Sequence, residues 1–258
     1  DWHHLIELCG LVRALVVDTL RPDVVVNTAA AHNVPQCEEN PSIAYAVNAT
    51  GARNLAIGCR ESGARLLHIS TDYVFGDGHS APIDESAAIA PLSTYGASKA
   101  AGEFLIASEC ANHVIIRTAA LYGESPCLAK GGRNFVGLML HLAETKGKVK
   151  VVTNEVTTPT WTKALARQIR VLADQGEPGV YHATCQGQCS WYEFAAAIFE
   201  YTKTPVQLDT AVAADFPSPV RRPLYSVLQN RHLQEQGIDV MPEWREALKA
   251  HLAAIGRM

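Results

Sequence analysis

The sequence has no uninterrupted apolar run of the roughly 20 residues that a membrane-spanning helix needs. Its first four residues, Asp1 to His4, lack the basic-then-apolar pattern of a signal peptide. Lysines and arginines form no cluster and the net charge is −4, which argues against nucleic acid as the main partner. We therefore expect no membrane and no nucleic-acid partner, and a cytoplasmic location is the default prediction.

The sequence also lacks a disulfide framework or a standard metal motif. Its seven cysteines are odd in number and scattered, which fits reduced thiols better than paired ones. Only His182, Cys185 and Cys189 stand close enough together to suggest a metal site. Their spacing matches no standard zinc pattern and has no second half. We expect no metal there and interpret these residues as buried small side chains at the end of a strand.

The order of the elements predicts an α/β fold. With 258 residues, 48% of them hydrophobic, the chain can form one large domain or two closely joined ones. Buried strands are predicted at 23–27, 65–69 and 113–117, because their apolar runs are continuous, as parallel sheets require. Helices are predicted at 5–20, 41–62 and 95–110. Strands that alternate with helices indicate a Rossmann-like, doubly wound parallel sheet.

The second half of the chain is expected to form a smaller α/β part. A loop at 123–133 precedes a helix that ends near Thr145, and further helices are predicted at 162–173, 191–201 and 242–255. Short strands are expected at 149–152 and 179–182, whereas the proline-rich stretch 217–223 cannot form regular structure. We expect a dinucleotide-binding domain at 1–120 plus 161–183 and a substrate domain at 121–160 plus 184–258, with a cleft between them.

Tyr95 and Lys99 are four residues apart, which puts a phenol and an ammonium on one face of a helix. A phenol has a pKa of about 10 and gives up its proton reluctantly at neutral pH. An ammonium at about 4 Å is worth roughly 4 kcal/mol at an effective dielectric near 20, enough to lower that pKa by about three units. We therefore expect Lys99 to make Tyr95 more acidic. The alternative is that Tyr95 packs in a core and Lys99 extends to water.

Ser70 and Thr71 follow directly after the predicted strand 65–69. Ligands of doubly wound folds bind at the carboxyl ends of the strands. The loop at 76–93, which contains glycines and prolines, leads back to the start of the Tyr95 helix. Thr71 and Tyr95 are therefore expected to face one pocket, in which Thr71 would position and polarise the substrate.

Several motifs in the chain carry a family resemblance. They are Asn27-Thr28-Ala29-Ala30, Asn48-Ala49-Thr50-Gly51, Ser70-Thr71-Asp72-Tyr73-Val74-Phe75, Tyr95-Gly96-Ala97-Ser98-Lys99, Arg117-Thr118, Asn134-Phe135, Thr158-Pro159-Thr160, Arg222-Pro223 and Trp244. In this order and register they resemble the extended short-chain dehydrogenase/reductase superfamily, and most of all the dTDP-4-dehydrorhamnose reductases. The resemblance covers nearly the whole chain and implies reduction of the 4-keto group of a nucleotide-linked 6-deoxy sugar by NADPH or NADH.

The resemblance also implies roles for the residues near the reacting groups. Tyr95 matches the acid that protonates the ketone oxygen, and Lys99 the residue that lowers the tyrosine pKa and binds the nicotinamide ribose. Thr71 matches the hydroxyl that holds the substrate oxygen. Ser70, at the same strand end, Ala29 and Ala30 are expected to bind the cofactor, the two alanines as small residues against which it runs.

Further matches concern the substrate. Val34 and Asp72 match positions near the sugar, and Arg222 belongs to a segment that faces the nucleotide sugar. The alternatives are that Ala29 and Ala30 are ordinary packing at a strand end and that Arg222 is a solvated loop charge. A nucleotide-sugar substrate is thus the expected partner, and the resemblance is also compatible with a homodimer.

The sequence departs from the family pattern in two main ways. Family members begin with a strand and a Gly-x-x-Gly-x-x-Gly turn for the pyrophosphate, a pattern that none of the eighteen glycines forms. We expect that at least about forty residues of a complete nucleotide-binding half are absent from this sequence. The reductases also usually place a tryptophan where Ala120 stands, so we expect a wider sugar pocket.

Two other functions stay open at this point. The missing glycine turn would suit a non-catalytic regulatory or binding subunit of the same fold. A nucleotide-sugar epimerase or dehydratase would keep its cofactor bound and recycle it, whereas a reductase consumes it. Fold alone does not decide between these functions.

Overall fold

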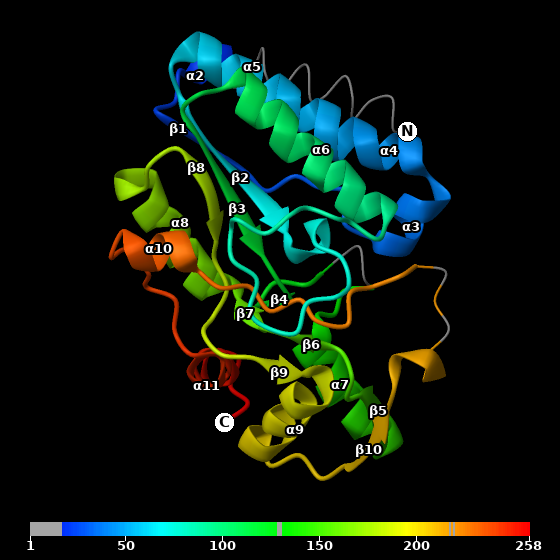
Figure 1. Cartoon of the computed structure of the whole chain (residues 1–258). Coiled ribbons are helices and arrows are strands. Elements are labelled where there is room, and N and C mark those ends of the chain that lie inside the picture. The colour runs from blue at the N-terminus through cyan, green and yellow to red at the C-terminus, as the bar shows by residue number, and fades with distance from the viewer. Residues whose placement is uncertain (1–16, 128–130, 217, 219) are drawn as a thin grey trace.

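A four-stranded parallel sheet lies at the centre of the structure, a computed structural model that describes residues 17–127, 131–216, 218 and 220–258. The strand order is β1-β2-β3-β8 (Figure 1). The strands are β1 (Val24–Asn27), β2 (Arg65–Thr71), β3 (His113–Thr118) and β8 (Gly179–His182). Continuous apolar runs predicted the parallel strands correctly, but the prediction that the first is buried is wrong, because β1 lies at the edge of the described sheet with Val24 and Val26 exposed.

Helices cover both faces of this sheet. On one face lie α5 (Ala52–Ser62) and α6 (Thr94–Glu109), and on the other α8 (Thr162–Gln175) and α10 (Arg231–Glu235). Successive residues of β2 point to opposite faces: Leu66 belongs to the core that contains Ile106 of α6, and Leu67 to the core that contains Leu165 of α8. The doubly wound fold is confirmed.

A second core lies beyond the carboxyl ends of the strands (Figure 1). Its helices are α7 (Phe135–Lys146), α9 (Trp191–Thr202) and α11 (Trp244–Ala254). Its strands pair as β5 (Lys148–Val152) with β10 (Gln207–Ala211), β4 (Leu121–Tyr122) with β7 (Thr160–Trp161) and β6 (Val156–Thr157) with β9 (Cys189–Ser190). The Phe194 ring is at its centre and contacts those of Tyr122, Phe135 and Trp244.

The segment predicted as one helix at 41–62 contains a π-helical turn. It consists of α4 (Pro41–Tyr45), η2 (Ala46–Gly51) and α5, which ends before Gly63 at a φ of 78°. The wider turn places the Asn48 amide in a buried position, where it bonds both backbone groups of Ala31 and the Ser98 hydroxyl. The loop after β1 is thereby tied to helix α6.

Other predictions have mixed outcomes. Most of the helix predicted at 5–20 lies outside the described residues. Its last residues form α2 (Asp18–Leu20). Cys185 and Cys189 are buried in the second core, and the His182 ring bonds the carbonyl oxygens of Ile83 and Gln229. Among the described residues, no group of His, Cys, Asp and Glu is placed to hold a metal ion.

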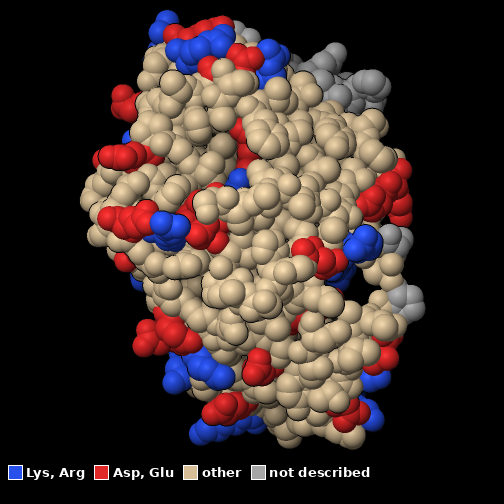
Figure 2. Space-filling view, viewed as in Figure 1, with Lys and Arg blue, Asp and Glu red and all other residues tan. Residues whose placement is uncertain are grey.

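The surface carries mixed charges. On the face shown in Figure 2, basic side chains lie beside acidic ones and form no continuous basic patch. Arg231, for example, pairs with both Asp84 and Glu235. Within the part of the chain that the structure describes, no helix combines the length and the apolar character needed to cross a bilayer.

Replacement of Gly102 by alanine is expected to destabilise the protein. A Cβ at this position of α6 would overlap the carbonyl oxygen of Asn48 in the π-helical turn, so one of the two helices would have to move. Overpacking of this kind costs about 1–3 kcal/mol. The free energy of unfolding in urea measures the effect. Gly137→Ala is the control, since the nearest atom to a Cβ there lies at 3.8 Å in the open first turn of α7. Equal stabilities of the two variants would contradict the close packing of α6 on the turn.

Candidate active site

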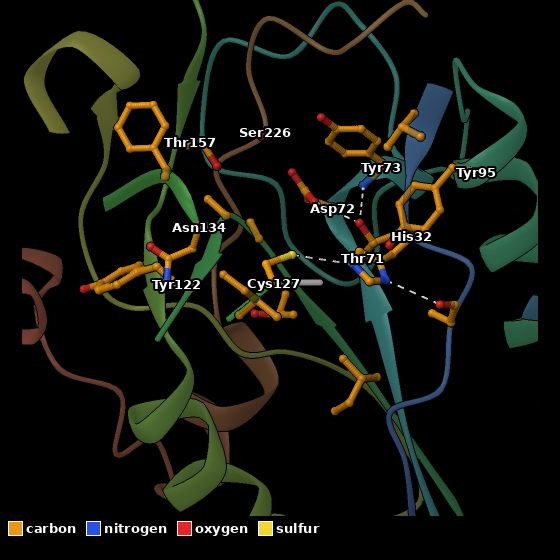
Figure 3. A pocket seen from close by; sticks show the side chains of 18 of the residues that line it. His32, Thr71, Asp72, Tyr73, Tyr95, Tyr122, Cys127, Asn134, Thr157 and Ser226 are labelled. Carbon is orange, nitrogen blue, oxygen red and sulfur yellow. Dashed lines mark hydrogen bonds between the residues drawn. The ribbon is translucent and has the colours of Figure 1, made fainter. Parts of the chain in front are cut away.

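A cavity of about 760 Å³ opens where β1, β2 and β3 end, between the sheet and the second core. Figure 3 shows Thr71, Asp72, Tyr73 and Tyr95 on one side of this cavity, with Asn134 on the other. Because the strands are parallel, their carboxyl ends meet along one edge and bring distant segments together.

Tyr95 is held in the first turn of α6 by contacts from three segments. The Ser93 hydroxyl caps the helix at the backbone N–H of Gly96, as such caps commonly do. Glu38 of α3 (Val34–Glu39) accepts hydrogen bonds from the Thr94 backbone and hydroxyl at 2.7 and 2.6 Å. The Tyr95 ring then meets the Tyr73 ring edge-on, with 5.8 Å between the centroids.

Thr71 and Asp72 form the turn that closes β2. The Thr71 hydroxyl accepts the backbone N–H of Tyr73 at 3.2 Å and donates to an Asp72 oxygen at 3.0 Å. Burial raises the pKa of Asp72 to about 6, although hydrogen bonds from Ser226 and Thr71 work in the opposite direction. A carboxyl group with this pKa changes its charge close to neutral pH.

The prediction that Lys99 lowers the pKa of Tyr95 is wrong for this structure. Burial raises the pKa of the Tyr95 phenol, and the group that opposes this rise is the Thr71 hydroxyl, not Lys99. The Lys99 nitrogen is directed at the sheet instead, where it lies 2.9 Å from His68 Nε2 and 2.6 Å from the Ile69 carbonyl oxygen. The two side chains do share a helix face, but the longer one reaches past the first turn into the sheet.

Lys99 is buried in a polar layer between α6 and the sheet, with 1% of its surface exposed. Burial lowers its pKa to about 8, against the effect of the Glu103 carboxylate one turn along the helix. Glu103 forms a buried ion pair with Arg117, 2.7 Å between Nη2 and Oε2, and accepts a hydrogen bond from Ser70. Burial of ionised groups requires such partners, although Nη1 of Arg117 has no hydrogen-bond partner among the described residues.

The structure brings most of the predicted site residues to this cavity. Those that line it are Ala30, Val34, Ser70, Thr71, Asp72, Tyr95, Lys99 and Arg222. Ala29 does not line it, and its backbone N–H bonds the Asn27 side-chain oxygen instead. Ser70 reaches the cavity, but its hydroxyl is directed at Glu103.

A second cavity, of about 1060 Å³, shares part of its wall with the first. Tyr73, Glu155, Trp191 and Arg222 line both, and Lys150 adds a further positive charge to the second. Glu155 and Trp191 were not predicted from the sequence. They belong to the short segments around β6 and β9, and no local sequence pattern predicts that these two strands pair.

The residues at the strand ends fit a dinucleotide cofactor. The cavity wall there consists of small side chains, those of Thr28, Ala30, Ala119 and Ala120, which leave room for a flat ring and a ribose. Lys99 lines the same cavity and offers N–H donors to a ribose hydroxyl. Beside them, the Tyr95 and Thr71 hydroxyls can both bond one carbonyl oxygen, and Tyr95 can give it a proton.

Comparison with known proteins agrees with this chemistry. The family model of the RmlD substrate binding domain matches residues 11–256. The chain is 41% identical over 232 residues to the spore coat polysaccharide biosynthesis protein SpsK of Bacillus subtilis, covering 90% of this chain and 79% of that one. It is 35% identical over 250 residues to the dTDP-4-dehydrorhamnose reductase of Escherichia coli, covering 93% and 82%.

Solved structures give the same result. A dTDP-4-dehydrorhamnose reductase of Clostridium acetobutylicum superposes with a TM-score of 0.91 at 39% identity, over 96% of this chain and 86% of that one. The Bacillus anthracis reductase in complex with NADP has a TM-score of 0.89 at 35% identity, over 96% and 85%. The chain therefore belongs to the dTDP-4-dehydrorhamnose reductase family of the extended short-chain dehydrogenases/reductases.

Proposed function

We propose that this protein reduces the 4-keto group of a dTDP-linked 6-deoxy sugar, dTDP-4-dehydrorhamnose or a related dTDP-4-keto sugar, with NADPH or NADH. The observation that carries the proposal is the convergence of the Thr71 hydroxyl, the Tyr95 phenol and the Lys99 amine on one cavity at the strand ends. Relatives that bear the reductase name, and a relative in complex with NADP, support it.

The cofactor would lie along Ala30, with its ribose at Lys99, and would supply a hydride to the ketone carbon. The protein then has to protonate the oxygen. Because burial raises the pKa of Tyr95, the phenol keeps its proton at neutral pH and is the acid that the reaction needs. An alkoxide is far more basic than a phenolate, so the proton moves once negative charge develops on the oxygen.

Thr71 orients the ketone oxygen for this transfer. Its hydroxyl bonds Asp72 in the structure, and a hydroxyl hydrogen rotates easily between acceptors. With a ketone present, the Thr71 and Tyr95 hydroxyls both donate to its oxygen. Thr71 then gives up its bond to Asp72 and is held by the backbone N–H of Tyr73, which donates to its oxygen. Val34 and Asp72 border the sugar.

The two cavities suggest how the substrate is divided along the site. We assign the dinucleotide to residues 1–120 with 161–183, and the nucleotide sugar to residues 121–160 with 184–258. The second cavity offers Arg222 and Lys150 to the diphosphate and the Trp191 ring to the base. Ala120, whose small side chain borders the first cavity, leaves more volume beside the sugar than a tryptophan would.

Tyr95→Phe is expected to lower kcat at least about 100-fold, because it removes the proton donor, while the thermal unfolding midpoint changes little. Oxidation of NADPH or NADH in the presence of a dTDP-4-keto sugar measures the rate. Tyr45→Phe, at an exposed position of α4, is the control and should retain full activity. Full turnover by Tyr95→Phe would show that the proton comes from elsewhere. Consumption of one reduced cofactor per sugar would also separate a reductase from an epimerase or dehydratase.

Arg222→Ala is expected to raise KM for the nucleotide sugar about 10- to 100-fold with a smaller effect on kcat. A hydrogen bond between charged groups contributes about 1.5–3 kcal/mol, and this one would hold the diphosphate rather than the reacting carbon. The neighbouring Arg221 pairs with Asp77, so Arg221→Ala is the matched control. The same rise of KM in both variants would indicate a general charge effect and contradict the assignment of Arg222.

Asp72 is expected to make stability pH-dependent. Its pKa is about 6 in the folded protein against an ordinary value of 3.8, so the folded state holds the proton more tightly. The stability that this group contributes is present below pH 3.8 and is lost as the pH rises to about 6. Urea unfolding should therefore show that wild type loses stability relative to Asp72→Asn between pH 4 and 6. Asp209→Asn is the control, because Lys148 lowers the pKa of Asp209 and the sign is reversed.

A further inference from the structure

Three buried polar side chains connect the first strand of the sheet to helix α6. Asn27 and His68 are register partners on β1 and β2, and their side chains are joined by Asn27 Nδ2 and His68 Nδ1 at 2.9 Å. His68 Nε2 lies 2.9 Å from the Lys99 nitrogen. All three are buried, with exposed fractions of 6%, 0% and 1%. Nothing in the mechanism above uses Asn27 or His68.

The orientation of the Asn27 amide is fixed by a backbone group. The Ala29 N–H donates to Asn27 Oδ1 at 3.1 Å. A backbone N–H can only donate, so the oxygen of the amide has to face Ala29 and its NH₂ group has to face His68. If the amide were turned over, two donors would face each other at Ala29.

The amide in turn fixes the tautomer of His68. Nδ1 accepts from the Asn27 NH₂ group, so a neutral imidazole carries its hydrogen on Nε2. Burial lowers the pKa of His68 well below its ordinary value, which keeps the ring neutral. The Nε2–H group then points at Lys99.

An ammonium has no lone pair and cannot accept a hydrogen bond, whereas a neutral amine can. With this tautomer of His68, the 2.9 Å contact to Lys99 is a hydrogen bond only when Lys99 is a neutral amine, which accepts from Nε2–H and donates to the Ile69 carbonyl oxygen. We infer that Asn27 and His68 are a positioning pair that decides whether Lys99 carries a proton. The role of Lys99 in the reaction rests on the proposed function, whereas the effect of Asn27 and His68 on the protonation of Lys99 does not.

The other charges near Lys99 do not replace this pair. Glu103 on α6 favours the ammonium, yet its carboxylate is shared between Arg117 on β3 and Ser70 on β2. Tyr95, which lines the same cavity, stays protonated at neutral pH because burial raises its pKa, and the Asp72 carboxylate lies at the turn after β2, where it accepts from the Thr71 hydroxyl. Of these titratable side chains, His68 is the one whose hydrogen bond to the Lys99 nitrogen the structure shows.

The pair also links Lys99 to the loop after β1. To become an ammonium and keep its bond to His68, Lys99 needs Nε2 as an acceptor, which moves the imidazole hydrogen to Nδ1. Asn27 must then present its oxygen to Nδ1 and release the N–H of Ala29. A change of charge at Lys99 is thus coupled to the backbone against which the cofactor is proposed to run.

NMR of the full-length protein without added cofactor tests the inference. In protein labelled with ¹⁵N-histidine, the nitrogen shifts of His68 distinguish a protonated from an unprotonated ring nitrogen, and His68→Gln assigns the signals. In protein labelled with ¹³C-lysine, the side-chain carbon next to the amine reports the titration of Lys99, assigned by Lys99→Met. We expect His68 protonated at Nε2 and a Lys99 midpoint no higher than about 8.

Asn27→Asp is the decisive variant, because it keeps the shape and the bond to Ala29 but offers only acceptors to His68. The hydrogen of His68 should move to Nδ1, and the pKa of Lys99 should rise by about one unit or more. Asn112→Asp, exposed at the start of β3, adds the same charge and should leave both signals unchanged.

Three results would overturn the inference: His68 protonated at Nδ1 in wild type, a Lys99 titration unchanged in Asn27→Asp, or an equal shift in Asn112→Asp. The wild-type measurement needs no variant and stands even if Asn27→Asp does not fold. A purely structural role of Asn27 and His68 would change stability but not the Lys99 titration. Failure of the proposed function would instead appear as an active Tyr95→Phe enzyme, so the two outcomes are distinguishable.

Discussion

Helix α6 directs two ionisable side chains, Lys99 and Glu103, into its dry interface with the sheet, and much of the site follows from their need for partners. They are four residues apart on the helix, and they meet alternate residues of β2, His68 and Ser70. Arg117 on β3 completes the layer by pairing with Glu103. Removal of one member of a buried charge pair costs about 3–5 kcal/mol, since the other is left without compensation. The layer therefore fixes the register of α6 on the sheet and, with it, the position of Tyr95 at the end of the helix.

The segments around α6 then place Tyr95 more finely. Glu38 of α3 holds the first residue of the helix, and Asn48 of the π-helical turn bonds the Ser98 hydroxyl, which donates to the Tyr95 carbonyl oxygen. Gly96 allows the helix to approach the Tyr73 backbone more closely than any side chain would permit. A π-helical turn costs regular hydrogen bonding and is often found at functional sites. Here it supplies the buried amide that ties the loop after β1 to helix α6.

The sequence predicted what depends on local pattern. Continuous apolar runs identified the strands, and the end of β2 together with the spacing of Tyr95 and Lys99 identified the cavity. The partner of Lys99 was not predictable in the same way. Helical spacing predicts which side chains lie on the same face of a helix. It does not predict the conformation of a lysine side chain, which depends on the hydrogen-bond partners in the sheet. His68 becomes the partner of Lys99 only when β1 pairs with β2 and α6 packs on the sheet. Glu155 and Trp191 were missed for the same reason, since distant chain segments bring them to the cavity.

These contacts lead to a different view of the proton donor from the one that a tyrosine-lysine pair suggests. A phenol whose pKa is lowered by a cation would lose part of its proton before substrate binds, and a reductase needs that proton. In this structure burial keeps the Tyr95 phenol protonated and lowers the pKa of Lys99 to about 8. The low-dielectric site makes any new charge costly, so the phenol gives up its proton only when the ketone oxygen has become negative. Binding energy for the sugar can come from the nucleotide end, where we propose that Arg222 and Trp191 contact parts of the substrate that do not react. In the proposed function, binding energy from the second cavity thus helps to hold the sugar in the first, where the proton is transferred.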